Sequence, residues 1–259
     1  MSWVAWAGHW GTDPSVWVGC ALALAAYPFL PGARRDRRGL AWTAGVLVLL
    51  IALESAIDQV GDTALFSVHM AQHLILAMVA PPLLIRGLPD ATVDAILRGP
   101  VGNGVRVLVH PLVAATLYFV VLIGWHIPVF FDYALTHDPV HIAQHLSFIA
   151  VGLCFWWAVV IHREGEPWNL GALGEVAYLT AGALPSVVVG LSLALVAHPV
   201  YSFYLDRSIR LGLSPLADQR LGGLLMFGFD NLLMVGVAGY YLWRLLPPDG
   251  SDVVGDATT

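Results

Sequence analysis

The stretch ALFSVHMAQHLILAMVAPPLLI, residues 64–85, contains no Asp, Glu, Lys or Arg. A helix needs about 20 predominantly apolar residues to cross the hydrocarbon core of a bilayer, and this stretch is long enough. A helix also satisfies its own backbone N–H and C=O groups, as lipid requires. Six further runs have the same character. The sequence therefore predicts an all-α, polytopic membrane protein with seven transmembrane helices, at about residues 15–31, 39–57, 64–85, 107–131, 139–161, 172–197 and 219–246.

The composition also favours a bilayer environment. Hydrophobic residues make up 58% of the 259 residues and charged residues 12%, whereas charged residues make up about 25% of a soluble domain. The formal charge of −6 is scattered and forms no basic patch, so we expect the lipid bilayer, and no nucleic acid, as a partner. Cys20 and Cys154 form no CxxC pair, so neither a disulfide framework nor a thiolate metal site is expected.

The connections between the apolar runs are short, which predicts one seven-helix transmembrane domain over residues 1–246. The polar residues 247–259 are expected to form a disordered cytoplasmic tail. The connection at 198–218 is long enough for a structure of its own, and we expect a short interfacial helix there.

Arginines are unevenly distributed between the two sets of loops. The first, third and fifth connections and the end of the last helix hold nine, whereas the opposite side holds three. Loops rich in Lys and Arg stay in the cytoplasm. The sequence therefore predicts an N-terminus outside and a C-terminus in the cytoplasm. It also puts eight of the ten histidines in the outer half or the outer loops.

Two nearly identical heptapeptides, VHMAQHL and VHIAQHL, begin 72 residues apart in the third and fifth runs. Each places two imidazoles four residues apart, on one helix face and about 5–6 Å apart at Cβ. Both helices run inward, so we expect His69 level with His141, and His73 level with His145. Ionisable groups at membrane depth are costly and commonly functional. The pattern predicts a metal site toward the extracytoplasmic side; hydrogen-bonded contacts between helices are the alternative.

His126 and His198 are also 72 residues apart, at the outer ends of the fourth and sixth runs. Helices three and four could therefore be a unit that helices five and six repeat about an axis along the membrane normal, which is a hypothesis. His126 is expected to close the metal site. Gln72 and Gln144, inside the heptapeptides, are candidate partners that orient the imidazoles.

Four other side chains of the outer half are candidates for an accessory role at this site: His198, Glu54, Asp218 and Met70. A carboxylate can ligate a metal or accept an imidazole proton, and a thioether suits soft copper. Asp218 has an equal alternative as the N-cap of the last helix. Asp230 lies deeper in that helix, and its role stays open.

Several segments resemble a known family. HMAQHLILAMVAPPLLIRGLP, the WHIP of the fourth run, HIAQHLSFIAVGLCFWW and DQRLGG are similar to the CtaG-type cytochrome c oxidase assembly factors, over roughly residues 40–245. The stretch LLMFGFDNLLM after DQRLGG departs from the family pattern. The matching positions are His69, His73, His126, His141, His145 and Asp218.

The resemblance implies a seven-helix protein of the bacterial plasma membrane that handles copper on the outer side and helps load it into a haem–copper oxidase. It implies the oxidase subunits as partners, with an extracytoplasmic copper chaperone as a further candidate. The implied function is that of a metal-handling assembly factor and not of an enzyme.

The ligand spacing alone indicates a metal bound by nitrogen. It leaves copper, zinc and iron open, and also one ion or two. A membrane di-iron hydroxylase or desaturase would use HxxxH boxes too, but it needs HxxHH boxes on the cytoplasmic side, and the chain has no HH dipeptide. A bis-histidine b-type cytochrome is the other alternative: two haems using both pairs would lie about 6 Å apart, which is too close, and one haem would leave the second pair unused. The chain has no GxSxG or HExxH motif.

Overall fold

The computed structural model describes residues 10–243, and every regular element in this range is helical. The all-α prediction is confirmed for these residues, whereas the expected tail at 247–259 lies outside them. The longer helices are α2 (Pro14–Ala26), α3 (Arg37–Glu54), α4 (Ala56–Thr63), α5 (Phe66–Leu74), α6 (Ala80–Gly87), α7 (Asp90–Arg98), α8 (Gly102–Leu108), α9 (Pro111–Trp125), α10 (Pro128–Ala134), α11 (Asp138–Val160), α12 (Gly171–Leu195) and α13 (Pro215–Trp243).

Five stretches are long and apolar enough to cross a membrane: Arg37–Thr63, Phe66–Gly87, Asp138–Val160, Gly171–Leu195 and Pro215–Trp243. In the fourth run, α8 and α9 meet at a bend of 64° and would count as one further span only together. The bend falls before Pro111, because the residue before a proline avoids the helical conformation. The first run forms a shorter apolar helix, Pro14–Phe29. The described residues thus provide five spans, or six with the bent pair, and the seventh remains a prediction.

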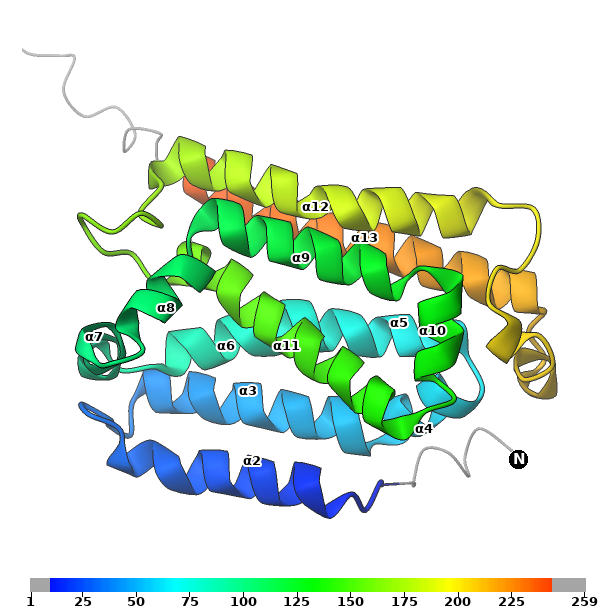
Figure 1. Cartoon of the computed structure of the whole chain (residues 1–259), viewed down its shortest axis with the longest axis horizontal. Coiled ribbons are helices and arrows are strands. Elements are labelled where there is room, and N and C mark those ends of the chain that lie inside the picture. The colour runs from blue at the N-terminus through cyan, green and yellow to red at the C-terminus, as the bar shows by residue number, and fades with distance from the viewer. Residues whose placement is uncertain (1–9, 244–259) are drawn as a thin grey trace, which may run out of the picture.

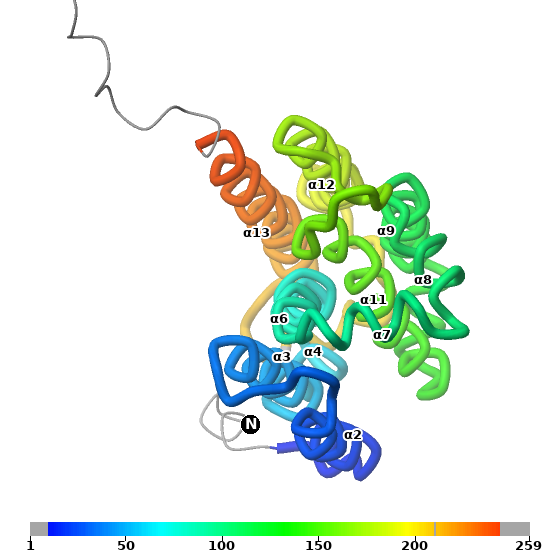
Figure 2. The backbone as a smooth tube through the Cα atoms, turned by 90° about the vertical axis from the view of Figure 1, so that its left-hand side faces the viewer, coloured from blue at the N-terminus to red at the C-terminus, as the bar shows by residue number. Residues whose placement is uncertain are grey.

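The span formed by α5 and α6 lies at the centre of the molecule. Figure 1 shows α12 and α13 side by side on one side, α2 and α3 on the other, and α11 crossing obliquely between them. The view at right angles shows α6 surrounded by α3, α11 and α13 (Figure 2). The same neighbours contact α5 or α6 directly. Side chains on α5 therefore point into the interior of the helix bundle.

The outward helix faces are apolar. Leu112, Leu195 and Leu232, on three different helices, are 75%, 77% and 75% exposed. Soluble monomers rarely expose large contiguous apolar patches, so this surface has the chemistry of one that contacts lipid.

The central span is not a uniform α-helix. Ile75–Val79 form a π-helical turn between α5 and α6, in which the carbonyl of Ile75 bonds to the N–H five residues later. Pro81 and Pro82 follow, and a proline has no N–H with which to complete the ordinary helical pattern. The wider turn absorbs this interruption. It begins two residues after His73, so it sets how the histidines of α5 are placed relative to α6.

The connection between α12 and α13 contains two short 3-10 turns, η3 (Ser202–Tyr204) and η4 (Ser208–Leu211), in place of the expected helix. A left-handed Gly212, with φ of 81°, ends the second turn. Tyr201 packs against the start of α5, where its ring stacks on that of Phe66 at a centroid distance of 4.9 Å. The connection therefore covers the end of the helix that carries His69 and His73.

Helices α12 and α13 pack most closely at two glycines. A Cβ at Gly190 would lie 2.7 Å from the carbonyl oxygen of Gly223, and a Cβ at Gly223 would lie 2.5 Å from that of Gly190. No real side chain tolerates such a separation from backbone. Close approach at small residues is a common basis of helix association in membranes.

Candidate metal centre

Four imidazoles meet between α5 and α11. The ring centroids of His69 and His141 are 5.4 Å apart, and those of His73 and His145 are 5.3 Å apart. Within each helix the two rings are 4.1 Å and 4.2 Å apart. The first histidine of each pair thus faces the first of the other, and the second faces the second. The two helices therefore bring the histidines together in the pairs expected from the two heptapeptides.

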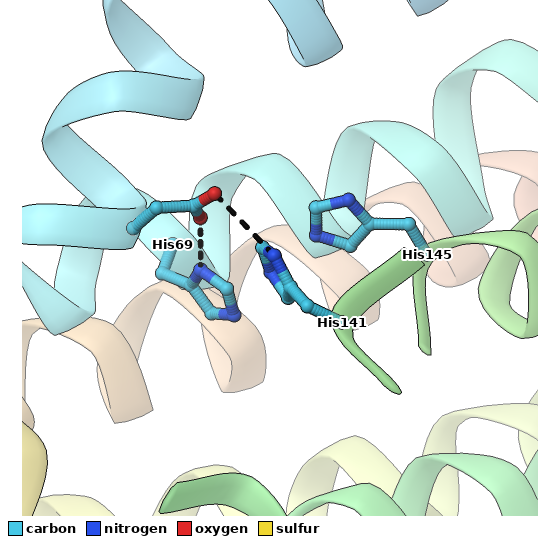
Figure 3. A group of neighbouring side chains, drawn as sticks. His69, His141 and His145 are labelled. Carbon is cyan, nitrogen blue, oxygen red and sulfur yellow. Dashed lines mark hydrogen bonds and ion pairs between the residues drawn. The ribbon is translucent and has the colours of Figure 1, made fainter. Parts of the chain in front are cut away.

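A carboxylate that the sequence patterns did not single out completes this group. Asp62 Oδ1 lies 3.1 Å from Nδ1 of His69, and its Oδ2 lies 3.5 Å from Nδ1 of His141. Figure 3 shows His69, His141 and His145 converging, with dashed lines for these two contacts. One ligand atom from each of Asp62, His69, His141 and His145 lies within 4.8 Å of the others. These four residues, which we call the outer group, could hold a metal ion.

Asp62 reaches the histidines because α4 turns back closely onto α5. A Cβ at Gly61 would lie only 3.0 Å from the Cα of His69, so a larger residue there would push the helices apart. The carbonyl oxygen of Gly61 accepts a hydrogen bond from the Tyr204 hydroxyl at 2.6 Å. Burial raises the pKa of Tyr204, so this hydroxyl keeps its proton and remains a donor. The position of Asp62 is therefore fixed from two sides.

Several imidazole nitrogens have no hydrogen-bond partner among the described residues. They are Nε2 of His69, His141 and His145 and both ring nitrogens of His73, all of them buried. Each buried polar atom left unpaired costs about 1–3 kcal/mol. Asp62 favours a proton on Nδ1 of His69 and His141, which leaves the Nε2 lone pair free. The donor set therefore fits a metal that accepts nitrogen ligands, such as copper or zinc.

His126 does not close the outer group. Its Nδ1 lies 2.6 Å from the carbonyl oxygen of Leu122, and its Nε2 lies 3.3 Å from Sδ of Met70. Its ring centroid is 6.5 Å from that of His73. Met70 stands between the two histidines of α5 in sequence, but its sulfur faces His126. These two predicted site residues therefore lie together, next to His73 and apart from the outer group.

Asp218 supports α5 from another helix. Its carboxylate accepts the backbone N–H of Phe66 at 2.7 Å and that of Ser67 at 3.0 Å. The residue before α5 forms no side-chain cap of its own. The predicted N-cap role on α13 is wrong, because the Ser214 hydroxyl accepts the N–H three residues later at the start of that helix. No hydrogen bond or ion pair within residues 10–243 joins Asp218 to an imidazole, so it contacts backbone and not the metal centre.

Two other accessory candidates lie away from the cluster. Buried Glu54 accepts the indole N–H of Trp17 at 3.0 Å and so faces α2. His198 is exposed, and its carbonyl oxygen accepts the Gln219 side chain at 3.4 Å. His126, by contrast, is buried. Because His126 and His198 differ in their environment, they give the repeat hypothesis no support.

The two glutamines of the heptapeptides do not orient imidazoles as expected. Gln72 donates to the carbonyl oxygen of Ala52 at 3.0 Å and to Oδ1 of Asp58 at 2.8 Å. Gln144 is buried, and its amide has no partner among the described residues. Identical sequence frames therefore lie in different surroundings, and Gln72 ties α5 to α3 and α4.

Fold and site together define an all-helical membrane protein with several apolar spans and a histidine–carboxylate cluster that three of them form. The family model described as cytochrome c oxidase caa3 assembly factor matches residues 23–247. The chain therefore belongs to the cytochrome c oxidase caa3 assembly factor family, in agreement with the resemblance noted in its motifs.

Similar curated proteins come from mycobacteria. Uncharacterized proteins of Mycobacterium bovis and Mycobacterium tuberculosis are each 29% identical over 227 residues, which cover 80% of this chain and 34% of theirs. One of Mycobacterium leprae is 28% identical over 216 residues, covering 76% of this chain and 32% of its own. The chain thus spans about a third of the length of these relatives. No solved structure matches the chain.

Proposed function

We propose that this protein assists the assembly of a haem–copper oxidase by binding copper at its histidine cluster and supplying it to the oxidase. Membership of the assembly factor family supports the assembly role. The excess of arginine in one set of loops supports a site toward the extracytoplasmic side of a bacterial plasma membrane. The proposed partners are the oxidase subunits and an extracytoplasmic copper chaperone.

The observation that carries the copper proposal is the set of unpaired imidazole nitrogens in His69, His73, His141 and His145. Histidines that merely joined helices would each donate or accept a hydrogen bond. Here the nitrogens converge beside one carboxylate instead. A metal ion is a partner for several of them at once, and the charge of Asp62 offsets part of the charge of the ion.

The exposure of the cluster suggests how copper would enter and leave. The side chains of Asp62 and His141 are 25% and 15% exposed, whereas that of His69 is fully buried. An incoming ion would therefore meet Asp62 and His141 before the buried imidazoles. If ligands of a partner displaced the imidazoles from the ion one at a time, the ion would keep some ligands throughout its transfer. Such stepwise exchange suits a carrier.

Haem binding and hydroxylase activity fit the site less well. The cavity lined by His73 and His126 has a volume of about 20 Å³. Pockets for small molecules and cofactors usually measure about 300–1,000 Å³. This cavity beside the outer group admits neither a porphyrin nor an organic substrate, and it is large enough only for a single ion or atom.

Replacing Asp62 with asparagine tests the copper site. Asp62→Asn keeps the shape of the side chain and removes its charge. We expect the copper affinity of the detergent-purified protein to fall about 10–100-fold, as for other groups that orient metal-bound histidines. Competition with a chromophoric copper chelator measures this affinity. Asp138→Asn is the matched control, because Asp138 is exposed, precedes His141 by three residues and lies outside the group.

Two results would contradict the copper site: wild-type protein that binds no copper, or an Asp62→Asn variant that binds it as tightly as wild type. The assembly role has a separate test in cells that lack the protein. Their oxidase should lose copper and activity, and wild-type protein should restore both. The Asp62→Asn variant should restore less at low external copper.

A further inference from the structure

A small cavity lies beside the histidine cluster. It has a volume of about 20 Å³, and its polar or sulfur-bearing lining includes Met70, His73, His126 and Met226. A cavity needs roughly 10–15 Å³ to hold one water-sized occupant. The space thus accommodates a single atom or ion. Two thioethers and two imidazoles are an unusual lining for so small a space.

The lone pairs in this cavity face each other without a proton between them. The carbonyl oxygen of Leu122 can only accept, so Nδ1 of His126, 2.6 Å away, carries the proton and donates it. In neutral imidazole the other nitrogen then has a lone pair. That nitrogen, Nε2, lies 3.3 Å from the sulfur of Met70, which is also an acceptor. Two hydrogen-bond acceptors that face each other need a proton or a cation between them.

A protonated His126 would be one such partner, but the surroundings disfavour it. An imidazolium there would be a buried charge, which is costly unless it is paired. None of the residues that line the cavity is an aspartate or a glutamate. A bound cation that both His126 and Met70 ligate satisfies the two lone pairs.

The separation of the two atoms suits a shared metal. Metal–nitrogen and metal–sulfur distances of about 2.0 Å and 2.3 Å, as in zinc sites, put two ligands at a tetrahedral angle about 3.5 Å apart. The observed separation of Nε2 of His126 from Sδ of Met70 is 3.3 Å. Soft thioether ligands with imidazole select Cu(I). The outer group has a carboxylate and no sulfur.

His73 connects the two positions. It lines the cavity, and its ring centroid is also 4.1 Å from that of His69 and 5.3 Å from that of His145. Both of its ring nitrogens are buried without a partner among the described residues. In a neutral imidazole either nitrogen can carry the lone pair, depending on the tautomer, so His73 can be a ligand at one position at a time.

We propose that the cavity is a second copper position, specific for Cu(I), in which Met70 and His126 are ligands and Met226 lies within reach. The inference rests on the proposed copper function and adds a site of different chemistry to it. His73 joins this inner position to the outer group, so that Cu(I) moves between them without release to solvent. The protein thus holds up to two ions, one bound by imidazole nitrogens beside Asp62 and one bound by nitrogen and sulfur.

The test is anaerobic titration of the full-length protein in detergent with Cu(I), combined with copper X-ray absorption. Wild type should bind two equivalents and show a sulfur scatterer. Met70→Leu conserves volume, so the fold should persist. It should bind one equivalent and lose most of the sulfur signal. Met78→Leu is the matched control, because Met78 is equally buried on the same span but accepts the Tyr118 hydroxyl and does not line the cavity.

The outcomes separate the two proposals. Asp62→Asn should weaken the outer equivalent and retain the sulfur signal. If wild type binds one equivalent without sulfur and Met70→Leu changes nothing, the inner position is wrong while the copper function stands. If wild type binds two equivalents but Met78→Leu removes the sulfur signal, the position assigned here is wrong. If wild type binds no copper, both proposals fail.

Discussion

Asp218 shows how much one side chain can contribute to a site that it does not touch. Its carboxylate accepts two backbone N–H groups at the start of α5, from residues 152 and 151 positions away in sequence. The first amides of a helix have no partner within the helix and carry its partial positive charge. A buried carboxylate satisfies both requirements. The helix with His69 and His73 is therefore held in place by α13.

Substitution of Asp218 should therefore change stability and leave the proposed copper ligands in place. In Asp218→Asn the side-chain oxygen still accepts one of the two backbone N–H groups. The side-chain NH2 group faces the other N–H and cannot accept it. We expect a loss of about 1–3 kcal/mol in the free energy of unfolding, the usual cost of an unsatisfied buried group. Thermal unfolding in detergent measures the loss, and copper stoichiometry is measured in parallel. A variant that unfolds like wild type but has lost copper would make Asp218 a ligand.

At the scale of residues, the sequence predicted that the four histidines meet, but it did not predict that Asp62 joins them. Equal spacing of His69, His73, His141 and His145 on two helices of the same direction was enough to predict that they face each other. Asp62 precedes His69 by seven residues, which on one continuous helix would put both side chains on the same face but about 10 Å apart along the axis, too far to touch. It reaches the imidazole because the chain reverses between α4 and α5 and because Gly61 lets the two helices touch. Such a reversal depends on tertiary packing.

Among the elements, α12 and α13 form a unit that contributes no histidine to the cluster. Their contact depends on the absence of side chains at Gly190 and Gly223, whose Cβ atoms would collide with backbone oxygen. Lipid tails are as apolar as the helix faces, so close packing holds such a pair together where hydrophobic burial cannot.

Two alanine substitutions on the same helix should have opposite effects. Gly223→Ala places a methyl group against the backbone of α12 and should destabilise the protein by about 1–3 kcal/mol. A Cβ at Gly228 would meet no neighbouring atom within 4 Å, so Gly228→Ala should stabilise by about 0.5–1 kcal/mol through helix propensity. Thermal unfolding of the two variants in one detergent makes the comparison. Equal destabilisation by both would show that helix flexibility, and not the contact, decides the effect.

The lengths of the apolar runs predicted the positions of the helices better than the number of helices that cross the membrane. Every run contained helix, but the fourth is bent before Pro111 and the first is short. The π-helical turn at Ile75–Val79 was not expected either, although Pro81 and Pro82 were visible in the sequence. Hydropathy records the average environment of a run, whereas prolines and neighbouring helices decide where the backbone bends.

For the whole molecule, the arginine distribution predicts which end faces outward. Thr136 and Glu164 are exposed and lie just beyond the two ends of α11. In a background with Cys20→Ala and Cys154→Ala, the Thr136→Cys variant should react with a membrane-impermeant maleimide in intact cells. The Glu164→Cys variant should react only after lysis. The reverse pattern would place the histidine cluster toward the cytoplasm and contradict delivery on the outer side.

The bond between Asp218 and the start of α5 also imposes an order on biosynthesis. Helices leave the ribosome in chain order, so α5 enters the membrane long before α13 is made. Until α13 is in place, two amides at the start of α5 lack their carboxylate partner. The proposed copper site is therefore completed only when α13 has packed against α5, and a chain truncated before α13 should bind copper more weakly.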